Sequence, residues 1–278
     1  MTIGGFAFER VFSMPTFEGV KILRAQVQRD PALSINEAVL LIRKVELDGA
    51  ALDLEASAVL AGLLPPQLPV DGAHFYRDCI RRILLAYQPS WTRTMLQGRS
   101  RFYATLERDE QSLFRQAGIL DNPPDDGFVD WWDTLAGEMR LIKAAEMMVR
   151  GRAAERLTMI HEAERLQRQG IDAQPKWIGL DDNTKGYDVL SYELSGGTLI
   201  NRMIEVKSTI ASPIRFIVTR NEWEQANRSG PAYSFYIWDM QKAPPILHIR
   251  SVEQVRPHIP SDNEKGRWQN AEVPLRGA

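Results

Sequence analysis

The chain has 278 residues, a length that allows two modest domains or one large domain. Hydrophobic residues make up 44% and charged residues 25%, which is the composition of a soluble globular protein and excludes a long disordered chain or a coiled-coil rod. The single cysteine, Cys79, excludes an intramolecular disulfide framework and a cysteine-rich zinc site. The net charge of -2 lacks the basic excess of many nucleic-acid-binding proteins, so a nucleic-acid function would depend on local patches.

Two observations bear on location. No apolar run reaches the ~20 residues that a transmembrane helix requires. The first residues also lack the basic region and apolar core of a secretory signal. We therefore expect the protein in the cytoplasm.

Residues 34–169 have the spacing of helices. Ser34 and Glu37 form a capping-box signature at the start of the first one. Further helices are expected over residues 52–64, 74–87 and 100–117, and one or two over residues 131–169. Within them, the cluster of Arg77, Arg81 and Arg82 is either a phosphate-binding patch or an ordinary helix surface.

The pattern changes to short strands after residue 174. The expected strands cover residues 176–180, 187–194, 202–208, 214–218, 233–238 and 247–249. Thr219 has the position of a cap for a short helix that ends before Gly230-Pro231. The sequence thus predicts an α+β protein with an all-helical N-terminal domain at 1–140, an α/β domain with a mixed central sheet at 141–260, and a flexible tail at 261–278.

Two carboxylates and a lysine are expected to converge in the second domain. Sixteen residues separate Asp188 from Glu205, which fits two antiparallel strands joined by the tight turn at Ser195-Gly196-Gly197. Glu205 and Lys207 share one face of their strand because side chains alternate with a period of two. Lys207 is therefore expected at the mouth of a site that Asp188 and Glu205 form.

That constellation has a chemical use. Two carboxylates, a backbone carbonyl and waters suit a hard cation such as Mg²⁺. The cation can polarise a phosphodiester, acidify a bound water and stabilise the leaving oxygen. A lysine beside it can orient or deprotonate that water.

The pattern Asp188-x16-Glu205-Val206-Lys207 resembles the active site of the PD-(D/E)XK, or restriction-endonuclease-like, nucleases. The longer strings resemble one subfamily, the C-terminal domain of the plant protein NO VEIN, whose relatives include Mrr-like restriction nucleases. These strings are Gly186-Tyr187-Asp188-Val189-x-Ser191, Ile204-Glu205-Val206-Lys207-Ser208-Thr209, Phe216-x-Val218-Thr219-x-Asn221-Glu222-Trp223 and Tyr233-x-x-Tyr236. The resemblance covers residues 147–240 and says nothing of residues 1–130.

The resemblance implies a restriction-endonuclease-like fold and an Mg²⁺-dependent endonuclease that cuts DNA, with Mn²⁺ as a substitute, in bacterial defence against phage or other foreign DNA. It assigns metal binding to Asp188 and Glu205 and catalysis to these two with Lys207. Glu155, in Gly151-Arg152-Ala153-Ala154-Glu155, matches the family's helix glutamate, although Ala154 stands where the family has a second glycine. Glu162, on the same helix face, is the competing candidate. Residues expected to contact substrate are Asn221, Arg220, Lys185 and Arg152.

Several alternatives stay open. The chain contains no Gly-x-x-x-x-Gly-Lys-Ser/Thr motif, so ATP coupling would require a partner ATPase or helicase. The helical half would then recognise DNA or dock that partner. The substrate could be RNA, and the active form could be a homodimer, because duplex cutting often needs two active sites. The alternative function is a catalytically silent nucleic-acid-binding or scaffold subunit of a defence complex.

Overall fold

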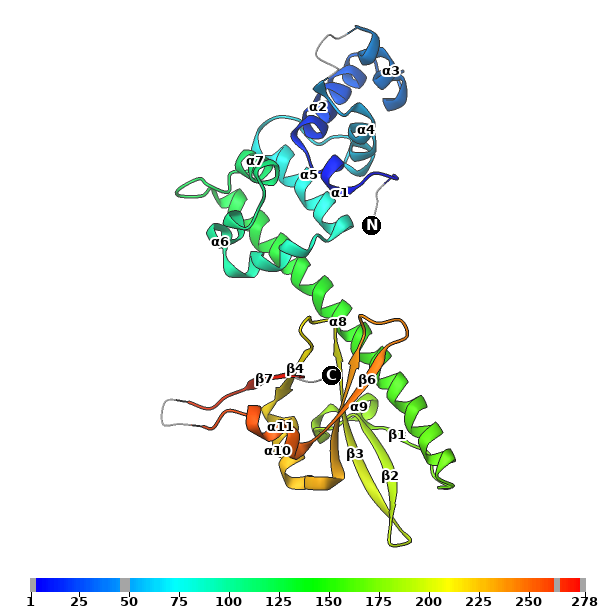
Figure 1. The fold of residues 1–278 in the computed structure, drawn as a ribbon. Helices are drawn as coiled ribbons and strands as arrows, with labels where there is room; N and C mark the ends of the chain where they lie inside the picture. The colour runs from blue at the N-terminus through cyan, green and yellow to red at the C-terminus, as the bar shows by residue number, and fades with distance from the viewer. Residues whose placement is uncertain (1–3, 46–50, 263–265, 276–278) are drawn as a thin grey trace. The chain divides into compact units, whose positions relative to one another are not determined.

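The computed structural model describes residues 4–45, 51–262 and 266–275, and the chain divides into two compact units, Met1–Ala144 and Ala145–Ala278 (Figure 1). One long helix, α8 (Asp126–Arg168), contributes residues to both units.

Unit 1 consists of helices packed around an aromatic core. Its elements are α1 (Phe8–Val11), α2 (Met14–Arg29), α3 (Ile35–Val45), α4 (Leu54–Leu63), α5 (Gly72–Tyr87), the 3₁₀ helix η2 (Ser90–Gln97), α6 (Arg99–Ala104), α7 (Arg108–Gln116) and the first part of α8. Phe102 and Phe114 lie at its centre with ring centroids 4.9 Å apart, and both rings are fully buried. Burial of such rings is a large apolar contribution to stability.

Local signals account for most of these helices. Ser34 and Glu37 form the expected capping box ahead of α3, with the Ser34 N–H donating to Glu37 at 2.8 Å. Residues 100–117, expected as one helix, are two, because a second capping box formed by Glu107 and Glu110 starts α7. The structure also contains α2, which the sequence analysis does not predict. None of the described helices combines the length and apolar character needed to cross a membrane.

Unit 2 is built on a five-stranded sheet, which is mixed, as the sequence predicts. The strands are β1 (Lys176–Trp177), β2 (Val189–Ser195), β3 (Thr198–Thr209), β5 (Tyr233–Asp239) and β6 (Ile246–Ser251), in the order β1-β2-β3-β5-β6. The central strand β3 is antiparallel to β2 and parallel to β5. Gly196 and Gly197 close the β2–β3 hairpin with φ values of 56° and 83°, which only glycine adopts easily.

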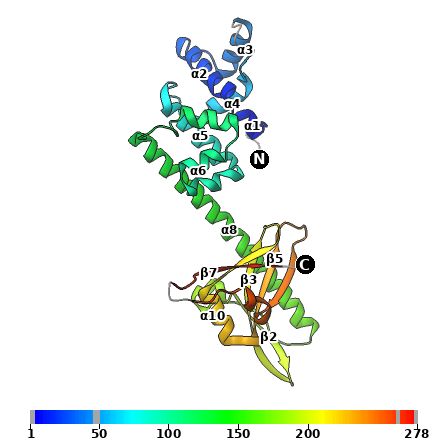
Figure 2. The same cartoon turned by 60° about the vertical axis from the view of Figure 1, so that its left-hand side comes forward.

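Different elements cover the two faces of this sheet. The C-terminal part of α8 packs on one face, where Ala154 joins a core with Val189, Ile204, Val206 and Tyr236. Helix α10 (Arg220–Ser229), helix α11 (Val252–Val255) and a second, two-stranded sheet pack on the other face (Figure 2). The fold is therefore α+β, with a helix on each side of the strand that carries Glu205, as expected.

The second sheet corrects the expectation of a flexible tail at 261–278. It pairs β4 (Arg215–Thr219) with β7 (Asn270–Pro274), and Ala271 and Val273 are buried. Residues 270–274 therefore do not belong to a flexible tail, because their apolar side chains complete a core; residues 263–265 and 276–278 of that segment lie outside the described residues.

The strand expected at 176–180 is shorter in the structure. It ends at Trp177, and α9 (Ile178–Asp181) and the 3₁₀ helix η3 (Asn183–Lys185) follow it.

Candidate active site

The β2–β3 hairpin places Asp188 opposite Glu205. The Asp188 N–H donates to the Ile204 carbonyl at 2.9 Å, and the adjacent register pairs Val189 with Ile204. Residues directly opposite each other in an antiparallel pair project from the same face. Asp188, Glu205 and Lys207 therefore share the face that α10 covers, and Ile204 and Val206 point into the α8 core.

Lys207 is the centre of the cluster. Its ammonium lies 2.8 Å from Glu205 Oε1 and 2.7 Å from Glu222 Oε2. Asp188 is fixed separately, because its Oδ2 accepts a hydrogen bond of 2.8 Å from the Val206 N–H. The Lys207 side chain is only 16% exposed, so it is held between two carboxylates and does not project from the mouth of the site as the sequence analysis expects.

The cluster has more acid than base, and the pKa values reflect this. Burial raises the pKa of Asp188 to about 6, although its bond from the Val206 N–H acts in the other direction, and the charge of Glu155 adds to the increase. Burial also raises the pKa of Glu205 well above its ordinary value, despite the attraction of Lys207. For Lys207 itself, burial favours the neutral amine, but the charges of Glu205 and Glu222 outweigh it and raise its pKa. Lys207 is thus an ammonium at neutral pH.

Glu222 is the site residue that the sequence analysis does not assign. It is the third residue of α10, and its carboxylate accepts from the Thr219 N–H at 2.9 Å while Thr219 Oγ1 accepts from the Glu222 N–H, which forms a capping box. Burial opposes its ionisation, but the ammonium of Lys207 outweighs that and lowers the pKa of Glu222. The available signal was the Thr219-x-x-Glu222 spacing, which predicts a cap but gives no reason to connect the cap with Lys207.

Two glycines let the backbone approach the cluster. The Gly179 N–H donates to the Asp188 carbonyl at 2.8 Å, and a Cβ at Gly179 would lie 2.6 Å from Asp188 Oδ1. Gly186 has a φ of 73°, and a Cβ there would lie 2.9 Å from the Gln225 Cβ on α10. The Tyr233 hydroxyl donates to the Gly186 carbonyl at 2.6 Å and ties this loop to β5. Any larger residue at Gly179 or Gly186 would displace the segment that carries Asp188.

The structure separates Glu155 from Glu162. Glu155 accepts hydrogen bonds from the Trp177 indole and from Arg152, and its charge reaches Asp188. Glu162 is completely buried against the α8 face of the sheet, where it accepts from the Tyr236 hydroxyl at 2.8 Å and pairs with Arg165. Glu155 is therefore the helix carboxylate that lies on the side of Asp188, whereas Glu162 belongs to a buried network behind the sheet.

The four residues expected to contact substrate differ in their availability. Arg152 is bound to Glu155 and to the Gly179 carbonyl. Arg220 pairs with Asp262 at 2.7 Å and with Glu224 at 2.9 Å, so acids already occupy its guanidinium. Lys185 is 58% exposed with only a loose contact to Asp182, and the exposed Asn221 lies beside Gly186. Lys185 and Asn221 are the two that remain open to solvent near Asp188.

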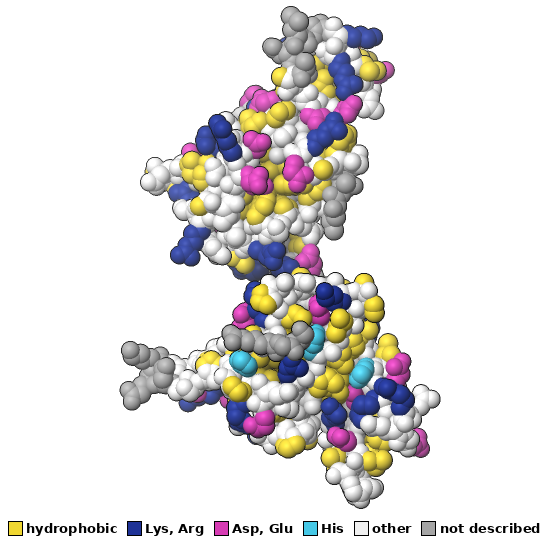
Figure 3. Space-filling model, viewed as in Figure 1, with side chains coloured by type: hydrophobic (Ala, Val, Ile, Leu, Met, Phe, Trp, Pro, Cys, Tyr) yellow, Lys and Arg dark blue, Asp and Glu magenta, His cyan; other side chains and the backbone are white. Residues whose placement is uncertain are grey.

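The basic cluster of α5 is mostly engaged within the fold. Arg77 is buried and forms a two-pronged pair with Asp125, and Arg81 pairs with Glu138. On the face seen in Figure 3, Lys and Arg side chains are scattered among acidic and apolar ones. The ordinary structural interpretation of Arg77 and Arg81 is therefore the better one.

The donor set fits a hard divalent cation. No group of three or more His, Cys, Asp or Glu side chains among the described residues has an arrangement that would hold a metal ion. Mg²⁺, however, is commonly bound through only one or two carboxylates together with waters. Asp188 and Glu205 supply two such carboxylates on one face, and burial raises the pKa of both despite the charge of Lys207.

Comparison with known proteins gives one match. Residues 154–249, about a third of the chain, match the family described as protein NO VEIN, C-terminal. No curated protein and no solved structure matches the chain. The matched segment begins within α8 and ends in β6, so it contains Asp188, Glu205, Lys207 and Glu222 but not Arg152.

Proposed function

We propose that the protein is an Mg²⁺-dependent endonuclease of the restriction-endonuclease-like superfamily that hydrolyses phosphodiester bonds in DNA. The observation that carries the proposal is the placement of Asp188 directly opposite Glu205, with Lys207 two residues further along on the same face. Buried structural ion pairs seldom need an excess of acid, because each unpaired carboxylate is costly to bury. A site that receives a cation explains that excess.

In this proposal, each side chain of the site would have its own role. Asp188 and Glu205 would hold Mg²⁺, which when bound supplies Lewis-acid stabilisation of the charge that develops on a phosphodiester. Lys207 remains protonated, so it would orient the attacking water or a phosphate oxygen by donating hydrogen bonds and would not act as a base. Glu155 would contribute charge beside Asp188, and Lys185 and Asn221 would contact the nucleic-acid backbone.

The biological setting belongs to the same proposal. The motif strings resemble the NO VEIN C-terminal domain, whose relatives include Mrr-like restriction nucleases, and this resemblance supports a role in defence against foreign DNA. Unit 1, which lies outside the matched segment, would recognise DNA or dock a partner such as an ATPase or helicase. An active homodimer would provide one site for each strand of a duplex.

Cleavage of a supercoiled plasmid by the full chain tests the proposal. We expect nicked or linear product with Mg²⁺ or Mn²⁺ and none with EDTA, and loss of product in Glu205→Gln. The matched control is Glu193→Gln, which removes an exposed carboxylate from the same hairpin. Cleavage in EDTA would contradict the metal requirement. Binding of the plasmid without cleavage under every condition would favour the alternative function, a catalytically silent DNA-binding subunit.

A further inference from the structure

A hollow in unit 2 lies away from the carboxylate cluster of Asp188, Glu205 and Glu222. Its volume is about 480 Å³, within the range of small-molecule sites. Its apolar floor consists of Val255, Val273 and Leu275, all buried, and its polar lining is Arg250, Gln254 and His258. The hollow therefore combines an apolar surface with three side chains that carry hydrogen-bond donors.

Most of these donors have no acceptor among the described residues. Within the described part of the chain, the Arg250 guanidinium has one hydrogen bond, from Nη1 to the Ile249 carbonyl at 2.9 Å, and His258 has none from its side chain. The Gln254 side chain uses its oxygen to accept from the Ser251 N–H, so its amide N–H groups remain available. No Asp or Glu among the described residues lines the hollow. Within the described residues, the lining thus offers a positive charge that no carboxylate balances and N–H groups that are free to donate.

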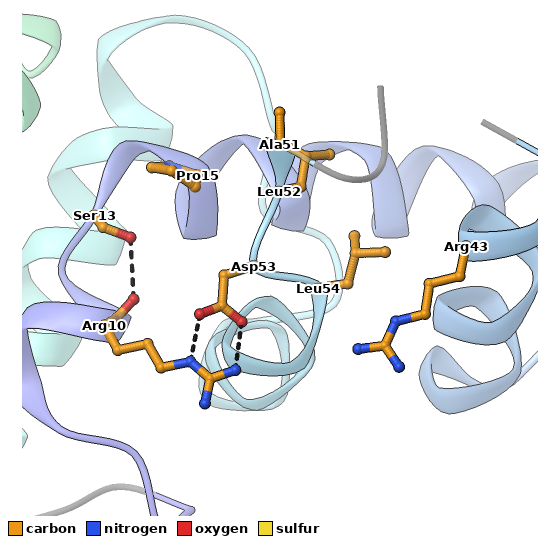
Figure 4. A pocket seen from close by; sticks show the side chains of 8 residues that line it. All are labelled: Arg10, Ser13, Pro15, Arg43, Ala51, Leu52, Asp53 and Leu54. Carbon is orange, nitrogen blue, oxygen red and sulfur yellow. Dashed lines mark hydrogen bonds and ion pairs between the residues drawn. The ribbon is translucent and has the colours of Figure 1, made fainter. Parts of the chain in front are cut away.

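A hollow in unit 1 gives a contrast. Its volume is about 410 Å³, and it is lined by two arginines, Arg10 and Arg43 (Figure 4). There, however, Arg10 pairs with Asp53 and both arginines pair with Glu55, so their charges are already balanced. Of these two hollows, the one at Arg250 leaves its arginine without a carboxylate partner among the described residues.

The Arg250 hollow is also distinct from the proposed active site. Phe235 lies between Glu205 and Arg250 in the register of β3, β5 and β6, and its ring is fully buried. Phe235 belongs to a continuous apolar core with Val252 and Val255. A ligand in the hollow would therefore be separated from the carboxylate cluster by this apolar core and would not contact it.

We propose that this hollow binds a small organic anion, with its phosphate or carboxylate group on Arg250 and His258 and its apolar body on Val255, Val273 and Leu275. A guanidinium recognises either anion through paired N–H groups. The apolar floor adds affinity for an alkyl or aromatic body, because contact removes that surface from water. The proposal does not depend on the nuclease function.

An NMR titration of the isotope-labelled full chain tests it, with phenyl phosphate, benzoate, inorganic phosphate and benzyl alcohol as probes. We expect saturable shifts confined to residues 250–258 and 271–275 with phenyl phosphate or benzoate, and weaker binding of inorganic phosphate and benzyl alcohol. Tighter binding of phenyl phosphate than of benzoate would assign a phosphate, and the reverse a carboxylate; either supports the proposal.

Variants locate the anion contact. Arg250→Gln should weaken the better aromatic anion at least about tenfold, since a hydrogen bond to a charged group is lost, and His258→Gln should weaken it less. The matched control is Arg228→Gln, an exposed arginine of α10 that contacts only a backbone carbonyl and should leave binding unchanged. Unshifted resonances elsewhere establish that each variant is folded. Unchanged affinity in folded Arg250→Gln, equal binding of benzyl alcohol, or no saturable binding by any probe would overturn the proposal.

Discussion

The ammonium of Lys207 lies 2.7 Å from the Glu222 carboxylate, which simultaneously caps helix α10. A single carboxylate thus fixes both the start of a helix and the position of the cation in the cluster. The geometry of Lys207 consequently depends on how α10 begins. This helix starts at Arg220, sixteen residues after Ile204, where the pairing of β3 with β2 ends next to Asp188 and Glu205.

Glu222→Gln separates these two duties. Glutamine can still accept from the Thr219 N–H in a capping box, so the helix should be retained. The ammonium loses a charged partner, and we expect cleavage to fall about tenfold or more, with little change in DNA binding. Turnover and affinity measured separately on the same plasmid check this. Glu224→Gln, an exposed carboxylate of the same helix, serves as the control, and an unaltered turnover in Glu222→Gln would contradict a positioning role.

Lys207→Met should destabilise the protein, and more so at higher pH. Methionine keeps the apolar stem but leaves Glu205 and Glu222 buried without a cation, and loss of one partner from a buried ion pair costs about 3 kcal/mol or more. Without Lys207, the folded-state pKa values of both carboxyls rise. At low pH these groups are protonated and neutral, so their burial costs little. Stability is then lost as the pH increases through the raised pKa values. Urea unfolding of wild type and variant at about pH 5 and about pH 8 measures the difference. An equal deficit at both pH values would contradict this account.

Asp188 should itself make the metal-free protein less stable at neutral pH. Its folded-state pKa of about 6 lies above its ordinary value of 3.8, so the folded state binds the proton more tightly. The stabilising contribution is complete below about pH 4 and is lost as pH rises to about 6. Asp188→Asn can still accept from the Val206 N–H. At about pH 7.5 it should unfold at a higher urea concentration than wild type, with an unfolding free energy larger by at most about 3 kcal/mol. The advantage should disappear at about pH 4; a variant less stable than wild type at both pH values would disprove this.

Glu155 and Glu162 should behave differently when each is changed to glutamine. Glu162→Gln removes the charge that pairs with Arg165 in a buried network and should lower the unfolding free energy by about 3 kcal/mol. Glu155→Gln should leave stability nearly unchanged and reduce plasmid cleavage less than Asp188→Asn does, because Glu155 acts on Asp188 through its charge. Melting curves and cleavage rates for both variants provide the test. A stable, inactive Glu162→Gln would reverse the assignment.

The sequence predicts those parts of the site that depend on local geometry. The Asp188–Glu205 pairing follows from a short hairpin, whose register is set by its turn and by alternation, and the Thr219 cap follows from spacing alone. What it misses depends on contacts between distant segments. The pairing of β4 with β7 joins residues far apart in the chain, and the ion pair between Arg220 and Asp262 has the same origin. The contact between Lys207 and Glu222 arises only when α10 packs on the sheet.

The central claim is that Asp188 and Glu205 form a metal-dependent hydrolytic site, and a plasmid cleavage time course with Mg²⁺ tests it most directly. The comparison is between wild type and Asp188→Asn, with each protein shown to be folded by its melting curve. The account predicts that wild type converts supercoiled DNA to nicked or linear product, and that Asp188→Asn does so at least about a hundredfold more slowly. Cleavage by folded Asp188→Asn at the wild-type rate would contradict it.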